Sequence, residues 1–158
     1  VLTDGGLHYD EFGSVAKRFD VKDGLAIRML DTAGLTVAFI SGGRSGAIEQ
    51  RAAHLGVEYC YTGVRDKLSK VIDLKNKLSL QESNIAYLGD DLNDLAARPA
   101  VGLLVATADA SDDLKSQSDW ILSNRGGNGA AREFTDALLA AQRCLITVRK
   151  KGWREVNA

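Results

Sequence analysis

The sequence is poor in several residue types, and each shortage excludes a kind of chemistry. Its two cysteines, Cys60 and Cys144, lie far apart and form no CxxC pair, which argues against a zinc site and suits a reducing cytoplasm. Its two histidines, His8 and His54, give too little material for a histidine metal site or a Ser-His-Asp triad. An active site here must rely on carboxylates, hydroxyls and amines.

Strong charge and long apolar runs are missing as well. The formal net charge is −1, so the chain has no electrostatic footprint for nucleic acid or for an anionic membrane surface. Apolar runs stay short, which predicts no transmembrane helix, and no signal peptide is recognisable. With 158 residues, 45% of them hydrophobic, the chain can bury one sizeable core. We expect a cytoplasmic protein without nucleic-acid or membrane partners.

Short apolar runs alternate with helical patterns along the chain, and Pro99 is the only proline. The strand-like runs are almost wholly apolar, which is typical of a parallel sheet covered on both faces. We therefore predict an α/β fold of the Rossmann-like, doubly wound kind. The predicted strands cover 36–40, 59–61, 85–88, 101–105 and 120–122, and the predicted helices cover 23–34, 48–55, 67–78, 95–98, 109–116 and 130–145.

The first part of the chain predicts a small β-hairpin flap. Two strand-like runs, 7–10 and 15–21, flank a short polar turn that contains Gly13. Asp23 is expected to cap the helix that follows, or alternatively to orient a polar substrate. We expect one domain over 1–145, followed by a polar tail over 146–158.

The segment IAYLGDDLND places three carboxylates directly after a buried strand. Asp90, Asp91 and Asp94 would repel one another there, and a hard cation such as Mg²⁺ would relieve that repulsion. Ligands bind at the C-terminal strand ends of open α/β sheets, which favours a Mg²⁺-assisted site for a phosphorylated molecule. The alternative is an acidic helix cap without further function.

Two further positions suit an anion. Ser41, Gly42 and Gly43 end a predicted strand and open a helix, so a hydroxyl and free N–H groups could bind phosphate. A simple glycine turn is the alternative. Lys67 opens a helix, where the helix dipole disfavours a cation, so it either neutralises a phosphate or is an exposed lysine beside a capping Asp66.

A glycine-rich loop precedes the last predicted helix. Three of the four residues 126–129 are glycine, and Arg132 and Glu133 follow. Glycines allow a backbone to approach a ligand or another subunit closely. A flexible loop is the alternative.

In chain order, Ser41 after a strand, Lys67 at a helix start and GDDLND after another strand resemble the haloacid dehalogenase superfamily of phosphatases. Over about residues 1–142, one branch is similar in the segments VLTDGGLHYDEFGSVAKRFDVKDGLAI, GVRDKL, YLGDDLND and GGNGAAREF. That branch contains the 3-deoxy-D-manno-octulosonate 8-phosphate phosphatases and their nonulosonate 9-phosphate relatives. It also contains the phosphatase-like C-terminal module of some acylneuraminate cytidylyltransferases.

The resemblance implies a Mg²⁺-dependent phosphatase of an acidic sugar phosphate in lipopolysaccharide or surface-sugar synthesis. Its first expected substrate is 3-deoxy-D-manno-octulosonate 8-phosphate, and a nonulosonate 9-phosphate is the alternative. Asp90 would bind the Mg²⁺ and Asp91 would complete the cation environment. Lys67 would act in catalysis by neutralising phosphate, together with Asp94, which would orient the site or hold Lys67.

The resemblance also implies a substrate-binding set and an assembly. Ser41 and the N–H of Gly42 would hold phosphate, while Arg44, Asp23 and Arg132 are further candidates for substrate binding. Relatives lack a large cap domain and form homotetramers, in which neighbouring subunits cover each active site. The flap, the glycine-rich loop and the C-terminal tail would approach a neighbour.

The sequence departs from its relatives in three places. They carry a DxDG motif, whose two acids are nucleophile and general acid/base, directly before the segment that starts here at Val1. The printed chain lacks both acids, so we expect a fragment of a working phosphatase; a non-catalytic oligomerisation module is the alternative. Gly43 replaces an Arg or Glu, with Arg44 next, and Asn128 replaces a residue that is often charged. The last two departures bear on which sugar is bound.

Overall fold

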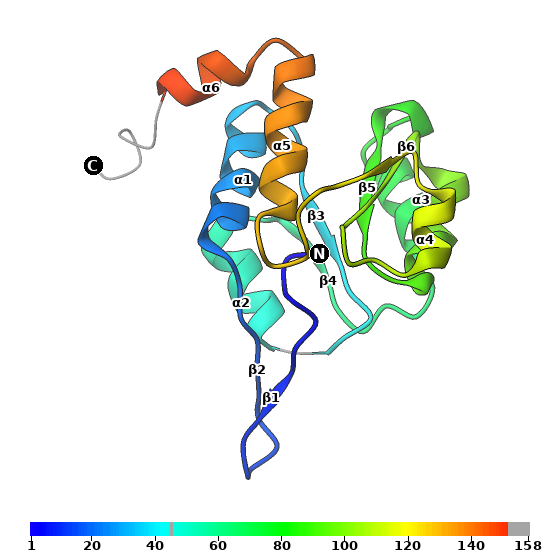
Figure 1. Ribbon diagram of the computed structural model, residues 1–158. Coiled ribbons are helices and arrows are strands. Elements are labelled where there is room, and N and C mark those ends of the chain that lie inside the picture. The colour runs from blue at the N-terminus through cyan, green and yellow to red at the C-terminus, as the bar shows by residue number, and fades with distance from the viewer. Residues whose placement is uncertain (45, 152–158) are drawn as a thin grey trace.

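The computed structural model describes residues 1–44 and 46–151 and confirms an α/β fold with parallel strands (Figure 1). The strands are β1 (His8–Tyr9), β2 (Val15–Ala16), β3 (Ala38–Ile40), β4 (Tyr59–Tyr61), β5 (Ala86–Gly89), β6 (Leu103–Ala106) and β7 (Trp120–Ile121). The α-helices are α1 (Val21–Thr32), α2 (Gly46–Leu55), α3 (Lys67–Lys77), α4 (Asp112–Gln117), α5 (Ala130–Ala141) and α6 (Leu145–Lys151). Two 3-10 helices are η1 (Glu82–Asn84) and η2 (Leu92–Ala100).

The strands form three hydrogen-bonded groups in place of the single main sheet expected. β1 pairs with β2 antiparallel, β3 with β4 in parallel, and β5, β6 and β7 in parallel order. The start of the chain runs between the ends of β3 and β5: Leu2 packs near Phe39 of β3, and the amine of Val1 pairs with Asp90 after β5. Among the described residues no strand pairs with both β3 and β5, so the parallel strands are divided there.

Helices cover both faces of the parallel strands, as the sequence predicts. In Figure 1, α1, α2 and α5 lie on one side and α3 and α4 on the other. Alternation along β6 serves both faces: Val105 packs against Phe134 of α5, while Leu104 packs with Val71 of α3 and Leu114 of α4. This two-sided burial fixes the strand ends whose loops carry the polar residues.

The flap is shorter than predicted because α1 starts early. The structure ends the second flap strand at Ala16, and the side chain of Asp20 caps α1 by accepting from the N–H groups of Lys22 (2.7 Å) and Asp23 (3.4 Å). The prediction of Asp23 as the cap of this helix is therefore wrong by three residues. The hairpin turn is closed by Asp10, which accepts from two backbone N–H groups.

The last predicted helix is two helices. Arg143 adopts a φ of 58°, and the N–H of Cys144 donates to the oxygen of Leu139 (3.0 Å), which ends α5 and redirects the chain. α6 then buries Val148 against Met29 of α1. Part of the predicted polar tail is thus packed, and the rest of that prediction falls on 152–158, outside the described residues.

Candidate active site

Three of the predicted site residues come from segments that follow the C-terminal ends of β3, β4 and β5. Ser41 follows β3, Lys67 opens the helix after β4, and Asp90 follows β5. β3 and β4 belong to one sheet and β5 to another, and the bond between Lys67 and Asp94 joins the segments that follow the two sheets.

Asp94 is the centre of this cluster. Its Oδ1 accepts from the Tyr87 hydroxyl (2.7 Å) and from the Lys67 ammonium, and its Oδ2 accepts from the N–H groups of Asp90 (2.9 Å) and Asp91 (3.2 Å). Burial alone would raise the pKa of Asp94, but the bonds with Lys67 and the other donors outweigh it and lower that pKa. The carboxylate is therefore held ionised and fully bonded, and it positions the groups around it.

Gly89 makes room for this centre at the end of β5. A β-carbon at that position would lie 2.6 Å from Cβ of Asp94 and 2.9 Å from a methyl carbon of Leu114. The glycine of the GDDLND segment is required by close packing.

Lys67 is buried, 7% exposed, so the alternative of an exposed lysine is wrong. Its ammonium also donates to Oδ1 of Asn93 (3.2 Å). The amide nitrogen of Asn93 in turn lies near Gly42, where a β-carbon would be 3.8 Å away. Asn93, which the sequence analysis did not single out, thus links the lysine to the Ser41–Gly43 turn.

The Ser41–Gly43 turn is fixed by the loop between β4 and α3. The N–H of Val64 donates to the oxygen of Ser41 (2.9 Å), and the N–H of Gly63 donates to the oxygen of Gly43 (3.1 Å). The N–H of Gly43 donates to the Ser41 hydroxyl (3.2 Å), whereas the N–H of Gly42 has no partner among the described residues. That free, exposed N–H suits an anion.

Arg44 extends away from this turn. Its side chain lies over Gly63, where a β-carbon would be 2.6 Å from its Nε. Gly63 has a φ of 66°, so a side chain there is disfavoured on both counts. The structure does not bring Arg44 into contact with Ser41 or Lys67.

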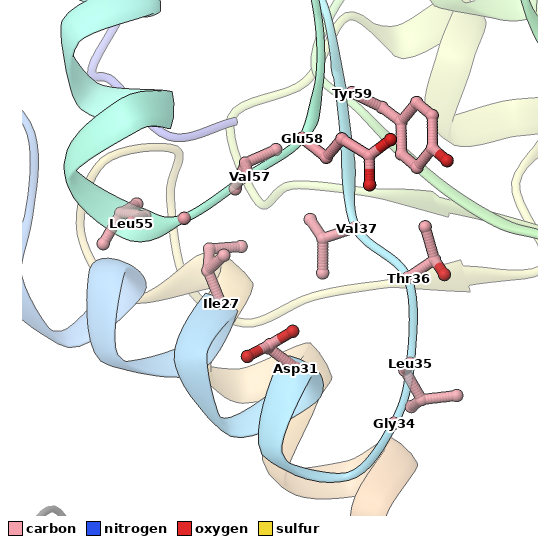
Figure 2. Close-up of a pocket in the computed structure, with 11 residues that line it drawn as sticks. Ile27, Asp31, Gly34, Leu35, Thr36, Val37, Leu55, Val57, Glu58 and Tyr59 are labelled. Carbon is pink, nitrogen blue, oxygen red and sulfur yellow. The ribbon is translucent and has the colours of Figure 1, made fainter. Parts of the chain in front are cut away.

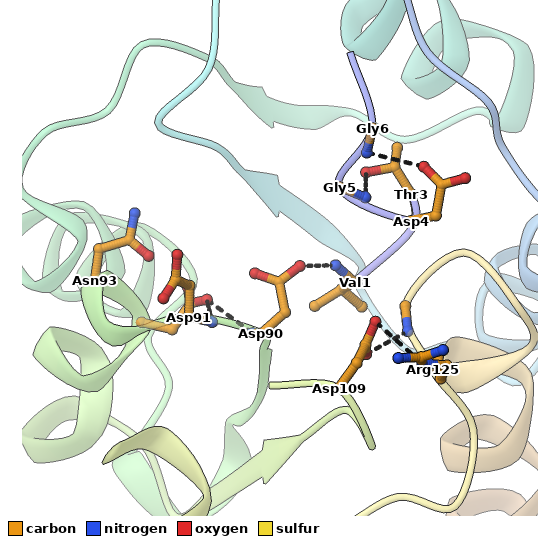
Figure 3. Close-up of polar contacts among 12 residues, drawn as sticks. Val1, Thr3, Asp4, Gly5, Gly6, Asp90, Asp91, Asn93, Asp109 and Arg125 are labelled. Carbon is orange, nitrogen blue, oxygen red and sulfur yellow. Dashed lines mark hydrogen bonds and ion pairs between the residues drawn. The ribbon is translucent and has the colours of Figure 1, made fainter. Parts of the chain in front are cut away.

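Asp90 and Asp91 follow β5 and differ in their present partners (Figure 3). The side chain of Asp90 is 43% exposed and pairs with the amine of Val1, while Asp91 caps η2 by accepting from Leu92 N–H (2.7 Å). The described residues contain no group of three or more His, Cys, Asp or Glu side chains able to hold a metal. Mg²⁺ is commonly held by one or two carboxylates, phosphate oxygens and water, so Asp90 and Asp91 fit such an ion.

Asp109, after β6, is a further carboxylate at this edge, and Figure 3 shows it on the other side of Val1 from Asp90. It accepts from the N–H of Gly126 (2.9 Å) and lies 4.0 Å from the Arg125 guanidinium. Burial raises its pKa, but the bond from Gly126 and the other donors lower it overall. In the sequence, the only feature that could have marked Asp109 as a site residue is its position shortly after a predicted strand.

The structure gives Asp23 and Arg132 partners other than those expected of substrate-binding residues. Asp23 is 1% exposed, and its carboxylate accepts from the N–H groups of Gly129 (3.1 Å) and Arg132 (3.1 Å). Asp23 is a residue of α1, and through these two bonds it caps the N-terminal end of α5. Burial raises the pKa of this carboxyl group. The Arg132 guanidinium donates to Asp136 (3.0 Å) on the same helix. Neither side chain contacts the Lys67–Asp94 cluster.

The cavity shown in Figure 2 lies at the opposite ends of β3 and β4. It measures about 270 Å³ and is bordered by Asp31, Val37, Leu55 and Glu58, among others. None of the predicted site residues borders it. In the described part of the chain, no helix is both long and apolar enough to cross a membrane.

The parallel α/β fold, with a serine, a buried lysine and aspartates at one edge, defines a phosphatase-type site of the haloacid dehalogenase class. Residues 61–134 match the family model described as haloacid dehalogenase-like hydrolase.

Closer relatives identify the branch. The chain is 43% identical over 142 residues to 3-deoxy-D-manno-octulosonate 8-phosphate phosphatase KdsC of Haemophilus influenzae, covering 90% of this chain and 79% of that protein. Against KdsC of Escherichia coli K12 the identity is 42%, with 90% and 76% covered. The chain belongs to the 3-deoxy-D-manno-octulosonate 8-phosphate phosphatase family, which confirms the resemblance seen in the sequence.

Solved structures agree with this assignment. The phosphatase from Yersinia pestis is 40% identical, with a TM-score of 0.89 over 92% of this chain and 78% of that one. The Moraxella catarrhalis phosphatase, solved in complex with a magnesium ion, a phosphate ion and a KDO molecule, is 34% identical. Its TM-score is 0.92, over 96% of this chain and 87% of that one.

Proposed function

We propose that this protein is a Mg²⁺-dependent phosphatase that hydrolyses 3-deoxy-D-manno-octulosonate 8-phosphate. The observation that carries the proposal is the buried Lys67 ammonium, which bonds to Asp94 and to Asn93. The amide nitrogen of Asn93 lies near Gly42, whose N–H has no partner among residues 1–44 and 46–151. A cation and an N–H donor, placed after the ends of two paired strands, can together bind a phosphoryl group. They would also stabilise the charge that develops during its transfer. The relatives named above act on this substrate class.

The printed chain contains no DxD motif, so its residues are assigned phosphate binding and charge stabilisation, and not the attack on phosphorus. Ser41 and Gly42 donate to phosphoryl oxygens, and Lys67 neutralises them. Asp94 holds the Lys67 ammonium in place. When bound by Asp90 and Asp91, Mg²⁺ would supply further neutralisation of the phosphoryl oxygens.

A nonulosonate 9-phosphate is the second candidate substrate. Gly43 and Asn128 stand where octulosonate phosphatases often carry charged side chains, and Arg44 points to Gly63. A longer acidic sugar could occupy the space that a side chain at residue 43 would fill.

We further propose a homotetramer, located in the cytoplasm, where both unpaired cysteines would stay reduced. The support for assembly is the flap. Tyr9 and Phe12 are 67% and 85% exposed on a hairpin whose strands are two residues each, which is marginal on its own.

The test is phosphate release by the full-length protein from 3-deoxy-D-manno-octulosonate 8-phosphate and from nonulosonate 9-phosphates, with and without Mg²⁺. Rapid Mg²⁺-dependent release from the first supports the proposal, and faster release from the second supports the second candidate. An Asp90→Asn variant should lose turnover and Mg²⁺ dependence; normal kinetics in it would remove Asp90 from the metal site. Inertness toward all of these esters would support a non-catalytic module.

A further inference from the structure

Lys17, which follows the flap, directs its ammonium at the Ser41–Gly43 turn. A β-carbon at Gly43 would lie 3.7 Å from Nζ of Lys17 and 3.6 Å from Oγ of Ser41. The ammonium and the hydroxyl therefore face the same position, and the absence of a side chain at Gly43 leaves that position open.

The charge of Lys17 is not used within the described chain. Its half-buried side chain has no hydrogen bond or ion pair to any residue of 1–44 or 46–151. The other lysine of this region, Lys67, is by contrast bonded to Asp94 and Asn93. A partly desolvated cation without a partner is costly, and binding an anion offsets that cost.

The two residues that follow Lys17 are held by contacts with other parts of the chain. Arg18 donates to the oxygen of Gly127 (3.2 Å) and lies 3.8 Å from Asp4, and the guanidinium of Arg51 lies 5.7 Å from the centre of the Phe19 ring. Lys17 is thus presented from an anchored segment, although it sits next to the flap.

Two cations approach the turn at different residues. Lys67 reaches the Gly42 side through Asn93, and Lys17 reaches the Gly43 side. An acidic sugar phosphate carries two anionic groups, and the phosphoryl group belongs with Lys67. We propose that Lys17 binds the carboxylate of the substrate and selects acidic sugars. This assignment rests on the proposed phosphatase function.

The test compares Lys17→Met and Lys17→Arg with Lys77→Met in the full-length protein. Lys77 is an exposed lysine at the far end of α3, so its variant controls for the lost charge. Lys17→Met should raise KM for 3-deoxy-D-manno-octulosonate 8-phosphate about tenfold, the loss of one charge-assisted contact. It should leave kcat/KM for 4-nitrophenyl phosphate, which has no carboxylate, within about twofold. Lys17→Arg keeps the positive charge, so its KM should stay close to the wild-type value.

Equal losses on both esters would place Lys17 at the phosphate and overturn the proposal, as would an unchanged KM. Calorimetry with 3-deoxy-D-manno-octulosonate itself separates this proposal from the proposed function, because it requires no turnover. Weaker binding by Lys17→Met than by Lys77→Met would support Lys17 even in a protein that hydrolyses none of the esters. Equal affinities would overturn it even in an active phosphatase.

Discussion

Lys67 and Asp94 form an ion pair whose side chains are only 8% and 5% exposed. The pair joins the first residue of α3 to the first turn of η2, the 3-10 helix after β5, so it holds two parts of the site together. Removing one partner of a buried pair leaves an uncompensated charge. We therefore expect Lys67→Met to lower the free energy of unfolding by about 3–5 kcal/mol, measured by urea denaturation.

A second variant tests whether this loss comes from the charge left behind. Lys67→Met combined with Asp94→Asn should be more stable than the sum of the two single variants predicts, because neither ion is then left alone. Strict additivity would contradict a direct ionic coupling. Activity of the full-length protein should be lost in every one of these variants.

Tyr87 donates to the same oxygen of Asp94 as Lys67 does. Tyr87→Phe keeps the ring and removes the hydroxyl, so it should cost about 1.5–3 kcal/mol, as for a hydrogen bond to a charged group. Tyr9→Phe, on the exposed flap, is the matched control and should change stability by less than about 0.5 kcal/mol. Equal unfolding midpoints for the two variants would show that the Tyr87 hydroxyl does not support Asp94.

The positions of the candidate site residues in the fold were predictable where the signal is local. Ser41 and Asp90 each follow an apolar run, and a strand end is where an α/β protein binds ligands. Lys67 was recognisable because a cation at a helix start conflicts with the dipole. The structure explains why a cation stands at this helix start, because Lys67 is buried and paired with Asp94.

Long-range contacts and irregular backbone were not predictable. Asp23 accepts from groups 106 and 109 residues away, and no local pattern signals that. Arg143 adopts a positive φ at a residue that rarely does so, which ends α5 early without a glycine or proline. The division between β3 and β5 depends on pairing partners and not on the apolar runs themselves.

Phe12 at the tip of the flap tests the proposed assembly. Phe12→Asp should shift the full-length protein from tetramer to smaller species in light scattering, because a charge would be buried in the subunit contact. Val21→Asp is the control, since Val21 is 82% exposed outside the flap. An unchanged tetramer in the Phe12 variant would remove the flap tip from the interface.

Asp119 predicts a pH dependence of stability. It accepts from the Arg98 guanidinium and from Leu104 N–H (2.8 Å), which lower its pKa below 3.8. The stabilisation is fully present above that unfolded value and is lost as the pH falls through the folded pKa. Asp119→Asn should therefore be less stable than wild type at neutral pH, and the difference should shrink in acid.

Unfolding at a series of pH values checks this expectation for Asp119. Asp113→Asn, an exposed carboxylate on α4, provides the control and should stay close to wild type throughout. A gap between Asp119→Asn and wild type that is constant down to acid pH would show that the ion pair with Arg98 is not its source.

Gly127 and Gly5 share a left-handed backbone but differ in their surroundings. Their φ angles are 64° and 81°. A β-carbon at Gly127 would lie 2.5 Å from the backbone of Thr3 and Asp4, whereas a β-carbon at Gly5 would have no atom within 4 Å. Gly5→Ala should thus cost only the conformational term, about 1 kcal/mol. Gly127→Ala should cost clearly more, because the backbone of Thr3 and Asp4 would have to move away from the new methyl group. Denaturation of both variants measures the difference, and equal costs would mean that the loop does not hold the start of the chain.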